Sequence, residues 1–374
     1  MVHPISGPDP AAGRISCSGS SAGHPCRTLP REEALFIHSP ESVMPISSPD
    51  LFDLSHCILC PRECGVNRTA GRYGFCGESA GLRAARAALL YYEEPCISGT
   101  RGSGAVFFTG CSLGCVFCQN AGIAGGLREG PAAAIPAITE DRLSDIFLEL
   151  EQQGAANINL VTASHFLPLI VPALESALRR GLSIPVVYNT SAYEKPAAIR
   201  RLDGLVDIYL PDLKFRSPAL GSRWASAPDY WDRATAVLEE MVRQCPVPLF
   251  ADGTSSLEEE NDADIPLMKR GVIVRHLVMP GQAEDAKAVL RYLHETYGNQ
   301  IFVSIMNQYT PMPQCAADPV LSRPTEQKEY DDVIDYAILL GIENGFIQEG
   351  ETISRSFIPA WDGTGVNSPS RPDT

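Results

Sequence analysis

The segment at residues 110–120, "GCSLGCVFCQN", places three cysteines within eight positions. They are Cys111, Cys115 and Cys118. The glycines of this segment permit the sharp backbone that would wrap three thiolates around one metal centre. Zinc is one interpretation, but a structural zinc site takes four ligands and the following Gln and Asn are poor zinc ligands. The other interpretation is a [4Fe–4S] cluster held by three cysteines, which leaves one iron with open coordination.

The cysteine segment directly follows a short apolar run, and similar runs recur along the chain. The predicted strands are "AVFFT" (105–109), "NINLVT" (157–162), "PVVYNT" (185–190), "VDIYLP" (206–211), "VIVRHLVM" (272–279) and "FVSIM" (302–306). Helical patterns lie between most of them, and "EQKEYDDVIDYAILLG" follows the last. This alternation predicts a parallel α/β fold, either an incomplete barrel or a doubly wound sheet.

Polar residues follow the predicted strands at their carboxyl ends, where α/β folds place their chemistry. The candidates are Thr162, Ser164 and His165 after the second strand, Asn189 after the third, Asp212 and Lys214 after the fourth, and Arg275 within the fifth. A purely structural chain has no need for polar groups repeatedly at one edge. We therefore expect one shared active site there.

Composition narrows the class of protein. The chain has 374 residues, 44% of them hydrophobic, and a formal net charge of −15, which argues against a general nucleic-acid binder. No run of about 18 apolar residues is present, so we expect no membrane span. The N-terminus lacks the pattern of a secretory signal, which favours a cytoplasmic, reducing location. There, twelve cysteines at short spacings favour metal binding over disulfides.

A second group of cysteines precedes the barrel pattern, in "CILCPRECGVNR" and "GRYGFCG". Its members are Cys57, Cys60, Cys64 and Cys76. Four thiolates suit structural zinc, an auxiliary Fe–S cluster is the rival, and ordinary reduced thiols are the third interpretation. We divide the chain into a disordered extension at 1–48, a Cys-rich metal-binding segment at 49–100, a core domain at 101–349 and a C-terminal tail at 350–374.

The cysteine spacing carries a family resemblance. Cys111-x3-Cys115-x2-Cys118, with Phe117 before the last cysteine, resembles the signature of the radical S-adenosylmethionine (SAM) superfamily. The blocks "GSGAVFFTGCSLGCVFCQN", "EEPCISG", "NLVTASHFLP", "YLPDLKF", "RHLVMPG" and "SIMNQYTP" resemble the uncharacterised PflX family, whose members are similar to pyruvate formate-lyase activating enzyme. The resemblance covers residues 55 to 350.

The resemblance implies a partial (β/α)6 TIM-like barrel of the radical SAM type, with a small N-terminal Cys-rich segment. It implies a [4Fe–4S] cluster whose open iron chelates SAM, and reductive cleavage of SAM to a 5′-deoxyadenosyl radical that abstracts hydrogen from a substrate. A flavodoxin- or ferredoxin-type protein would supply the electron.

The same resemblance implies roles for individual residues. The backbone at Phe117 should meet the adenine of SAM, and Asn189 the ribose. Asp212 and Lys214 would hold substrate or the SAM carboxylate, unless they form an ordinary solvated pair. Arg275 in an apolar strand needs a carboxylate partner, which is either SAM or a protein Asp or Glu.

One motif departs from the family. Many members have a Gly-Gly-Glu-type motif after the second strand that holds the SAM amino group, and here "VTASH" stands in its place. Thr162, Ser164 and His165 are the polar residues available there, and for His165 a structural role is an equal alternative.

Three functions remain open on the sequence. The first is a radical SAM enzyme that activates a partner protein by making a glycyl radical. The second is a radical SAM enzyme that modifies a small molecule or a peptide. The third, of another class, is a non-catalytic Fe–S or zinc protein for electron transfer or scaffolding.

Overall fold

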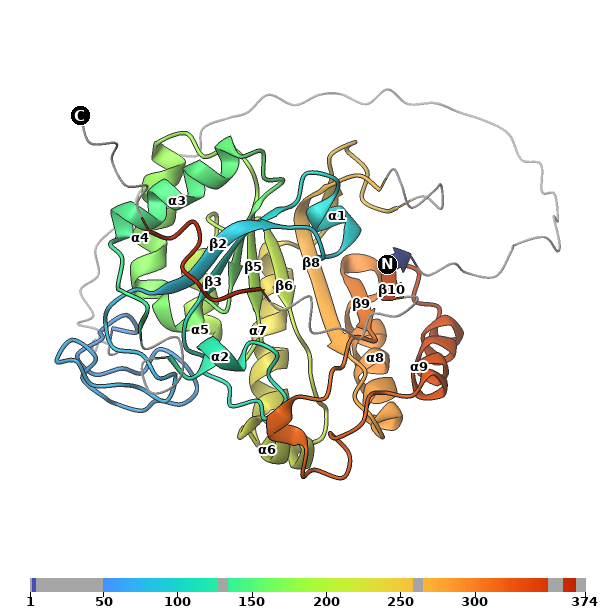
Figure 1. The fold of residues 1–374 in the computed structure, drawn as a ribbon. Coiled ribbons are helices and arrows are strands. Elements are labelled where there is room, and N and C mark those ends of the chain that lie inside the picture. Colours follow the sequence, from blue (N-terminus) through green and yellow to red (C-terminus); the bar gives the residue numbers. More distant parts are fainter. Residues whose placement is uncertain (1, 5–49, 127–133, 258–264, 349–358, 368–374) are drawn as a thin grey trace, which may run out of the picture.

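The computed structural model describes residues 2–4, 50–126, 134–257, 265–348 and 359–367. A curved, open sheet forms its centre (Figure 1), with the strand order β1-β10-β9-β8-β6-β5-β4-β3-β2. The strands are β1 (Val2–Pro4), β2 (Ala84–Leu90), β3 (Ser103–Phe108), β4 (Ile158–Val161), β5 (Val186–Thr190), β6 (Ile208–Pro211), β7 (Leu249–Phe250), β8 (Met268–Leu277), β9 (Phe302–Met306) and β10 (Gly345–Gln348). The strands from β3 to β10 in this order run parallel, and β1 and β2 are antiparallel edges.

The predicted α/β partial barrel is confirmed, and all six predicted strands are present. The sequence analysis did not predict β2 and β10. The first reads "AARAALL", and alanine is depleted in strands, while the second is only four residues long. Because β10 pairs parallel with β9, the sheet has one more parallel strand than the six-fold pattern predicts.

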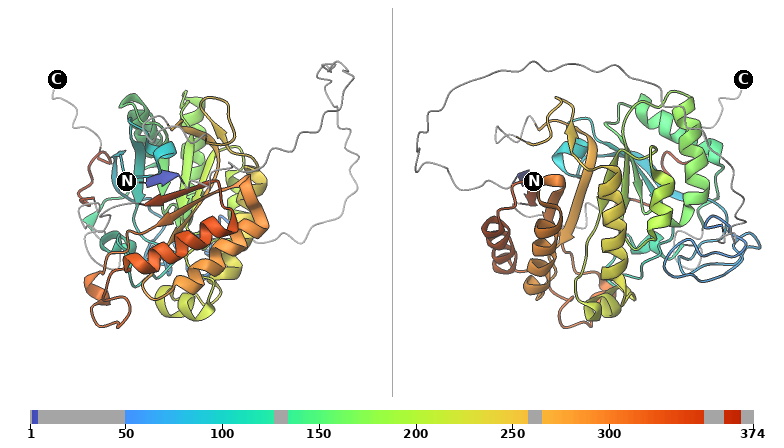
Figure 2. Two further views of the ribbon diagram at one scale, coloured as in Figure 1. Left: turned by 90° about the vertical axis from the view of Figure 1, so that its right-hand side faces the viewer. Right: turned by 180° about the vertical axis from the view of Figure 1, so that it is seen from behind.

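Helices cover the outer face of the sheet (Figure 2). The longer ones are α3 (Glu140–Gln152), α4 (Leu167–Arg179), α6 (Pro218–Ala225), α7 (Tyr230–Gln244), α8 (Ala283–Tyr297) and α9 (Gln327–Leu340). Apolar residues at helical spacing bury one side of each; in α3 these include Leu143, Ile146 and Phe147. None of the helices in the described ranges is long and apolar enough to cross a membrane.

The inner face of the barrel is divided into two halves. Around the amino ends of the strands, Val187, Ile208, Ile273 and Phe302 form an apolar cluster that includes residues of the short helix α1 (Pro95–Ser98). This apolar cluster occupies the amino-terminal end of the barrel. The carboxyl halves of the same strands carry polar residues instead, so the site is confined to that end.

The segments on either side of the barrel pack against it. Residues 50–83 form turns and irregular backbone, and Arg68 within them is only 1% exposed. Near the C-terminus, Ala87 N donates to Thr364 O (2.8 Å), and the ring of Trp361 lies 5.3 Å from that of Phe107. Residues 359–367 of the predicted tail are thus docked on β2 and β3. The expected disordered extension at 1–48 lies outside the described residues, apart from Val2–Pro4, which form β1.

Candidate active site

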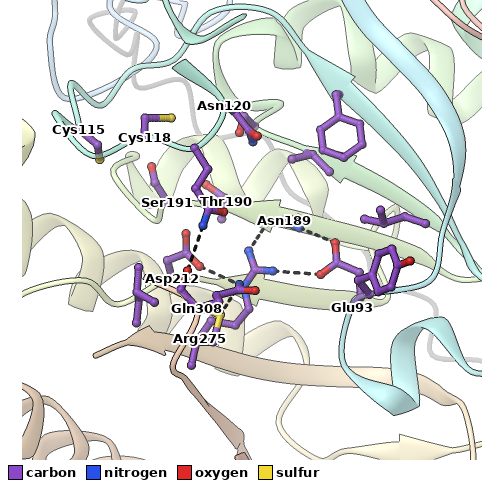
Figure 3. Close-up of a pocket in the computed structure, with 18 of the residues that line it drawn as sticks. Glu93, Cys115, Cys118, Asn120, Asn189, Thr190, Ser191, Asp212, Arg275 and Gln308 are labelled. Carbon is purple, nitrogen blue, oxygen red and sulfur yellow. Dashed lines mark hydrogen bonds and ion pairs between the residues drawn. The ribbon is translucent and has the colours of Figure 1, made fainter. Parts of the chain in front are cut away.

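A cavity of about 680 Å³ occupies the carboxyl half of the barrel (Figure 3). Side chains from the loop after β3 and from the ends of β4, β5, β6, β8 and β9 line it, together with residues that follow β2. Predicted site residues in the lining are Cys111, Cys115, Cys118, Phe117, Thr162, Asn189, Asp212, Lys214 and Arg275. The structure therefore brings these residues together at one edge of the sheet.

The cysteine loop is held by its backbone. Gly110 has φ +80°, and a Cβ there would meet the carbonyl oxygen of Cys76 at 2.7 Å, so only glycine fits without a shift. Cys111 N donates to that same carbonyl (3.1 Å), and Gly110 N donates to Ile123 O (2.8 Å). These bonds turn the chain sharply as it leaves β3 and direct the loop across the top of the barrel.

The thiols of Cys111, Cys115 and Cys118 line the same cavity, and electrostatic interactions among them affect their pKa values. Burial raises the pKa of the Cys111 thiol to about 11, and it raises the pKa values of Cys115 and Cys118 as well. The Lys214 ammonium opposes the rise at all three positions, so it lies near the whole triplet. Buried thiols of this kind favour the thiolate only when a cationic group binds them.

In the parts of the chain that the structure describes, no three His, Cys, Asp or Glu side chains are gathered in a way that could hold a single metal ion. One ion needs all its ligands at one point, about 2.3 Å from each sulfur for zinc. A [4Fe–4S] cluster binds each cysteine through a different iron and has no such need. Three thiols of one loop that line the same cavity supply the kind of ligand that such a cluster takes.

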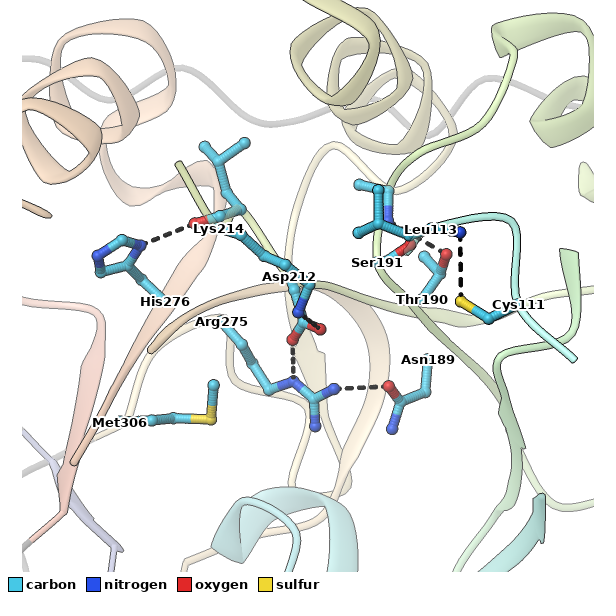
Figure 4. A network of polar contacts seen from close by, with 12 residues as sticks. Cys111, Leu113, Asn189, Thr190, Ser191, Asp212, Lys214, Arg275, His276 and Met306 are labelled. Carbon is cyan, nitrogen blue, oxygen red and sulfur yellow. Dashed lines mark hydrogen bonds and ion pairs between the residues drawn. The ribbon is translucent and has the colours of Figure 1, made fainter. Parts of the chain in front are cut away.

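A chain of alternating charges crosses the cavity below the cysteines (Figures 3 and 4). Lys214 Nζ lies 2.7 Å from Asp212 Oδ2, and Arg275 Nε donates to Asp212 Oδ1 (3.0 Å). Arg275 also donates to Glu93 Oε2 (3.1 Å) and to Asn189 Oδ1 (2.6 Å). Protein carboxylates thus supply the partner that Arg275 needs, and Asp212 and Lys214 form a largely buried pair rather than a solvated one.

The charges set the protonation of the carboxyl groups. Burial would raise the pKa of Asp212, but Lys214 and Arg275 together hold it below its ordinary value. Burial raises the pKa of Glu93 to about 7, although the Arg275 guanidinium opposes the shift. At neutral pH the cavity therefore contains one firmly ionised carboxylate and one that titrates.

Thr162 directly follows β4, and its backbone is unusual. Its φ is +59°, a left-handed conformation that is rare for a β-branched residue. Its N–H donates to Asn189 O (2.9 Å), and the residue lines the cavity. Non-glycine residues in this conformation cost of order 1–3 kcal/mol and cluster at functional sites.

Ser164 and His165 are absent from the cavity lining. They begin a short 3-10 turn behind β3, where both are buried. His165 Nε2 lies 2.6 Å from Thr109 O, and Arg68 donates to the His165 carbonyl (2.7 Å). Burial lowers the pKa of His165 to about 3, so this histidine is neutral. The structure thus supports the structural role for His165.

Phe117 forms part of the wall between the cysteines and the end of β9. Its ring meets those of Phe215 (6.0 Å) and Tyr309 (6.4 Å) edge to face, and it is 6% exposed. Gln119 Nε2 donates to Gln308 O (3.2 Å) just beyond it. The loop after β9 is therefore hydrogen-bonded to the cysteine loop.

Sequence reasoning missed Glu93 as a site residue. It follows β2 instead of a parallel strand, so the rule of strand carboxyl ends could not find it. Its carboxylate also accepts from Asn159 (3.0 Å) and Asn189 (3.3 Å). The one available signal was the pair of adjacent acidic residues in "EEPCISG" directly after an apolar run.

Cys57, Cys60, Cys64 and Cys76 also lie close together, and we call residues 57–76 the knuckle. Cys57 N donates to Val66 O (3.1 Å) and Gly65 N to Cys57 O (3.0 Å), which closes a tight loop around Cys60 and Cys64. Burial raises the pKa of Cys60 to about 12, with further contributions from the other three thiols.

The knuckle is joined to the cysteine loop of the cavity. Arg62 donates from Nε to Ser112 O (2.9 Å) and from Nη1 to Ser226 O (2.6 Å), and its guanidinium lies 3.8 Å from the centre of the Phe75 ring. With the hydrogen bond between Cys111 and Cys76, these contacts make the two cysteine-bearing segments neighbours. Of the other cysteines that the structure describes, Cys96 and Cys245 are buried, and Cys315 is buried with its Sγ 3.2 Å from Val116 O of the cysteine loop.

Comparisons with known proteins give distant likenesses. No family model matches the chain. The uncharacterised protein MJ0674 of Methanocaldococcus jannaschii is 25% identical over 301 residues, which is 77% of this chain and 79% of that protein. SuiB of Streptococcus suis, solved with its precursor peptide SuiA, has a TM-score of 0.40 and 14% identity, over 64% of this chain and 46% of SuiB.

A domain of pyruvate-formate lyase-activating enzyme from Bacteroides vulgatus has a TM-score of 0.32 and 11% identity, over 49% of this chain and 91% of that domain. The chain spans less than half of the SuiB chain that it matches. At such identities and TM-scores we infer chemistry from the site itself.

Proposed function

We propose that this protein is a radical SAM enzyme, in which Cys111, Cys115 and Cys118 hold a [4Fe–4S] cluster. One observation carries the proposal. Three thiols from one loop line the same cavity as the polar ends of the barrel strands. A cluster bound there leaves one iron open toward the cavity, where a small molecule can be chelated.

When bound, the cluster would chelate the amino and carboxylate groups of SAM and supply the electron that splits SAM into methionine and a 5′-deoxyadenosyl radical. The chain's own residues orient SAM. Lys214, beside the thiol triplet, offers an ammonium for the SAM carboxylate. Asp212 keeps that ammonium in place through its 2.7 Å ion pair. Because Asp212 stays ionised, this arrangement persists at neutral pH.

Other residues supply the remaining contacts and exclude water. The backbone at Phe117 and the side chain of Asn189 are proposed to meet adenine and ribose, since both line the cavity. Thr162 is the polar residue in the place of the missing Gly-Gly-Glu motif. Apolar side chains, among them Leu277 and Met306, cover much of the rest and would keep water away from a reactive radical.

The hydrogen donor is proposed to be an organic substrate held in the same cavity, either a glycine of a partner protein, a small molecule or a peptide. A flavodoxin- or ferredoxin-type protein is proposed to deliver the electron. The substrate and the electron donor are both proposed from the family resemblance. The cavity volume of about 680 Å³ is sufficient for SAM together with a small group.

The test is anaerobic. The protein is reconstituted with iron and sulfide, reduced with dithionite and incubated with SAM, and 5′-deoxyadenosine and methionine are measured by liquid chromatography. Wild type should form both, and Cys115→Ala should form neither. Cys245→Ser is the matched control, because Cys245 is buried away from the cavity, and it should keep activity. A wild-type protein that holds its cluster but releases no 5′-deoxyadenosine would indicate a non-catalytic Fe–S protein.

A further inference from the structure

We propose that Arg62 of the knuckle is a positioning residue for the cysteine loop, and that its charge favours the reduction of a cluster held there. Arg62 lies between Cys60 and Cys64 in the sequence, outside the lining of the cavity. The inference rests on the proposed function, because the loop that Arg62 contacts carries Cys111, Cys115 and Cys118.

The guanidinium of Arg62 bonds three backbone carbonyls from two distant segments. Its Nε donates to Ser112 O (2.9 Å), one residue after Cys111. Its Nη1 donates to Ser226 O (2.6 Å) and its Nη2 to Ala225 O (3.4 Å), where α6 ends. A guanidinium presents its five donors in a rigid planar fork, which the single ammonium of a lysine cannot reproduce. Arg62 therefore ties the cysteine loop to the end of α6.

The end of α6 also holds the cysteine loop directly. Gly114 N donates to Ala225 O (3.2 Å), and Val116 N donates to Trp224 O (2.9 Å). The Ala225 carbonyl thus accepts from the cysteine loop and from Arg62. Because the same segment receives both sets of bonds, Arg62 fixes the loop together with the support on which the loop rests.

Two aromatic rings restrict the guanidinium further. Arg62 Cζ lies 3.8 Å from the centre of the Phe75 ring and 4.8 Å from that of the Tyr193 ring. Ser112 Oγ in turn donates to Tyr193 O (3.4 Å). An arginine held between rings has already lost much of its rotamer freedom, so its hydrogen bonds to the loop are preorganised.

The charge of Arg62 has no carboxylate partner within the described ranges. The adjacent Glu63 is paired with Lys195 instead (2.7 Å). Burial raises the pKa of the Cys111 thiol, and the Arg62 guanidinium is among the groups that oppose the rise, so its field reaches this sulfur atom. Reduction makes a cluster more negative, and a nearby cation stabilises the more negative state. Arg62 should therefore raise the reduction potential.

Hydrogen exchange tests the positioning role. Arg62→Lys, Arg62→Met and the control Arg72→Met, at an exposed side chain of the same knuckle, are prepared anaerobically as full-length proteins with iron and sulfide. Mass spectrometry should show about tenfold faster exchange in both Arg62 variants for the peptide with Gly114 and Val116, and none for β8. The control should match wild type. Unchanged exchange in the Arg62 variants, or equal acceleration in β8, would overturn the positioning role.

A redox titration separates the charge of Arg62 from its hydrogen bonds. Electron paramagnetic resonance follows the reduced-cluster signal that changes on addition of SAM, so the cavity cluster is the one observed. Arg62→Met should lower the equilibrium constant for reduction about threefold, which is a midpoint potential about 28 mV more negative for a one-electron couple. Arg62→Lys keeps the charge and should stay near wild type. Equal potentials in wild type and Arg62→Met would refute the electrostatic role.

The proposed function and the role of Arg62 can fail separately. A wild-type protein without a cluster signal that responds to SAM would contradict the proposed function, and the exchange data would still decide whether Arg62 holds the loop. A wild-type signal that responds to SAM, with Arg62 variants equal to wild type in exchange and in potential, would contradict the role of Arg62 alone.

Discussion

Arg275 and Glu93 lie 182 positions apart in the chain, and Arg275 Nη1 is 3.1 Å from Glu93 Oε2. The contact joins β8 to the segment after β2 across the interior of the barrel. Arg275 also bonds Asp212 and Asn189, so one guanidinium ties three parts of the cavity wall together. Arg275 thereby places one positive charge against two carboxylates of the cavity.

Replacing that guanidinium should be costly. In Arg275→Met two buried carboxylates lose their shared cation, and breaking such a pair costs about 3–5 kcal/mol of unfolding free energy. The pKa of Glu93, already raised to about 7, should rise further because the opposing charge is gone. Urea unfolding and carboxyl-carbon NMR titration measure the two effects. Arg233→Met, which removes an exposed ion pair, should change stability by less than about 1 kcal/mol; equal losses in both variants would refute the interpretation.

Glu194 should make stability depend on pH. It is buried against Tyr188 and Thr190, and burial raises its pKa from 4.5 to about 7. The folded state therefore binds the proton more tightly than the unfolded state. This contribution to stability is complete below about pH 4.5 and is lost as pH rises to about 7, with a total of order 3 kcal/mol.

Unfolding measurements in steps from pH 4.5 to 8 test this expectation. The difference in unfolding free energy between wild type and Glu194→Gln should change across that window and level off above it. Glu284→Gln alters a carboxylate whose side chain is 89% exposed, and its difference from wild type should stay nearly constant. A flat difference for Glu194→Gln would show that this carboxyl group is not perturbed by burial.

Gly110 and Gly154 have similar backbone conformations but different surroundings, so the same substitution can be compared at both. Both have left-handed backbones, with φ of +80° and +91°. A Cβ at Gly154 meets nothing within 4 Å, so Gly154→Ala should cost only the conformational strain of about 1–2 kcal/mol. At Gly110 the Cβ would meet Glu78 Cγ at 2.6 Å and Cys76 O at 2.7 Å. Gly110→Ala should therefore cost at least about 3 kcal/mol and lower iron binding at the adjacent cysteine loop, as thermal unfolding and iron assays would show. Similar losses in both variants would mean that the loop tolerates the contact.

The docking of the C-terminal segment depends on Trp361. Its ring packs on Phe107, and a Cβ on Gly122 would lie 3.1 Å from it, so the indole fills a tight space. Trp361→Ala should destabilise the protein by about 2 kcal/mol, less than a fully buried tryptophan, and should speed proteolysis near residue 360. Ala360→Ser, at an exposed position of the same segment, is the control and should do neither. Unchanged proteolysis in Trp361→Ala would show that other contacts hold the segment.

Much of the fold was predictable because it depends on local pattern. Short β-branched runs such as β5 and β9 alternate with helices such as α8, and this periodicity identifies parallel α/β structure without any long-range information. Residues at strand ends, such as Asn189 and Asp212, could be placed in one cavity because parallel strands end at the same edge. The edge strand β2 was missed because its alanine-rich sequence has no strand pattern of its own.

The sequence by itself determined the candidate chemistry: the spacing of Cys111, Cys115 and Cys118 is a property of one short loop after one strand. Only the tertiary structure decided which charges surround that loop. Glu93 reaches the cavity from the segment after an antiparallel strand. His165 lies outside the cavity, with its ring nitrogen against the buried carbonyl of Thr109. The physical reason is that ion pairs and burial depend on contacts between distant parts of the chain, which neither spacing nor periodicity encodes.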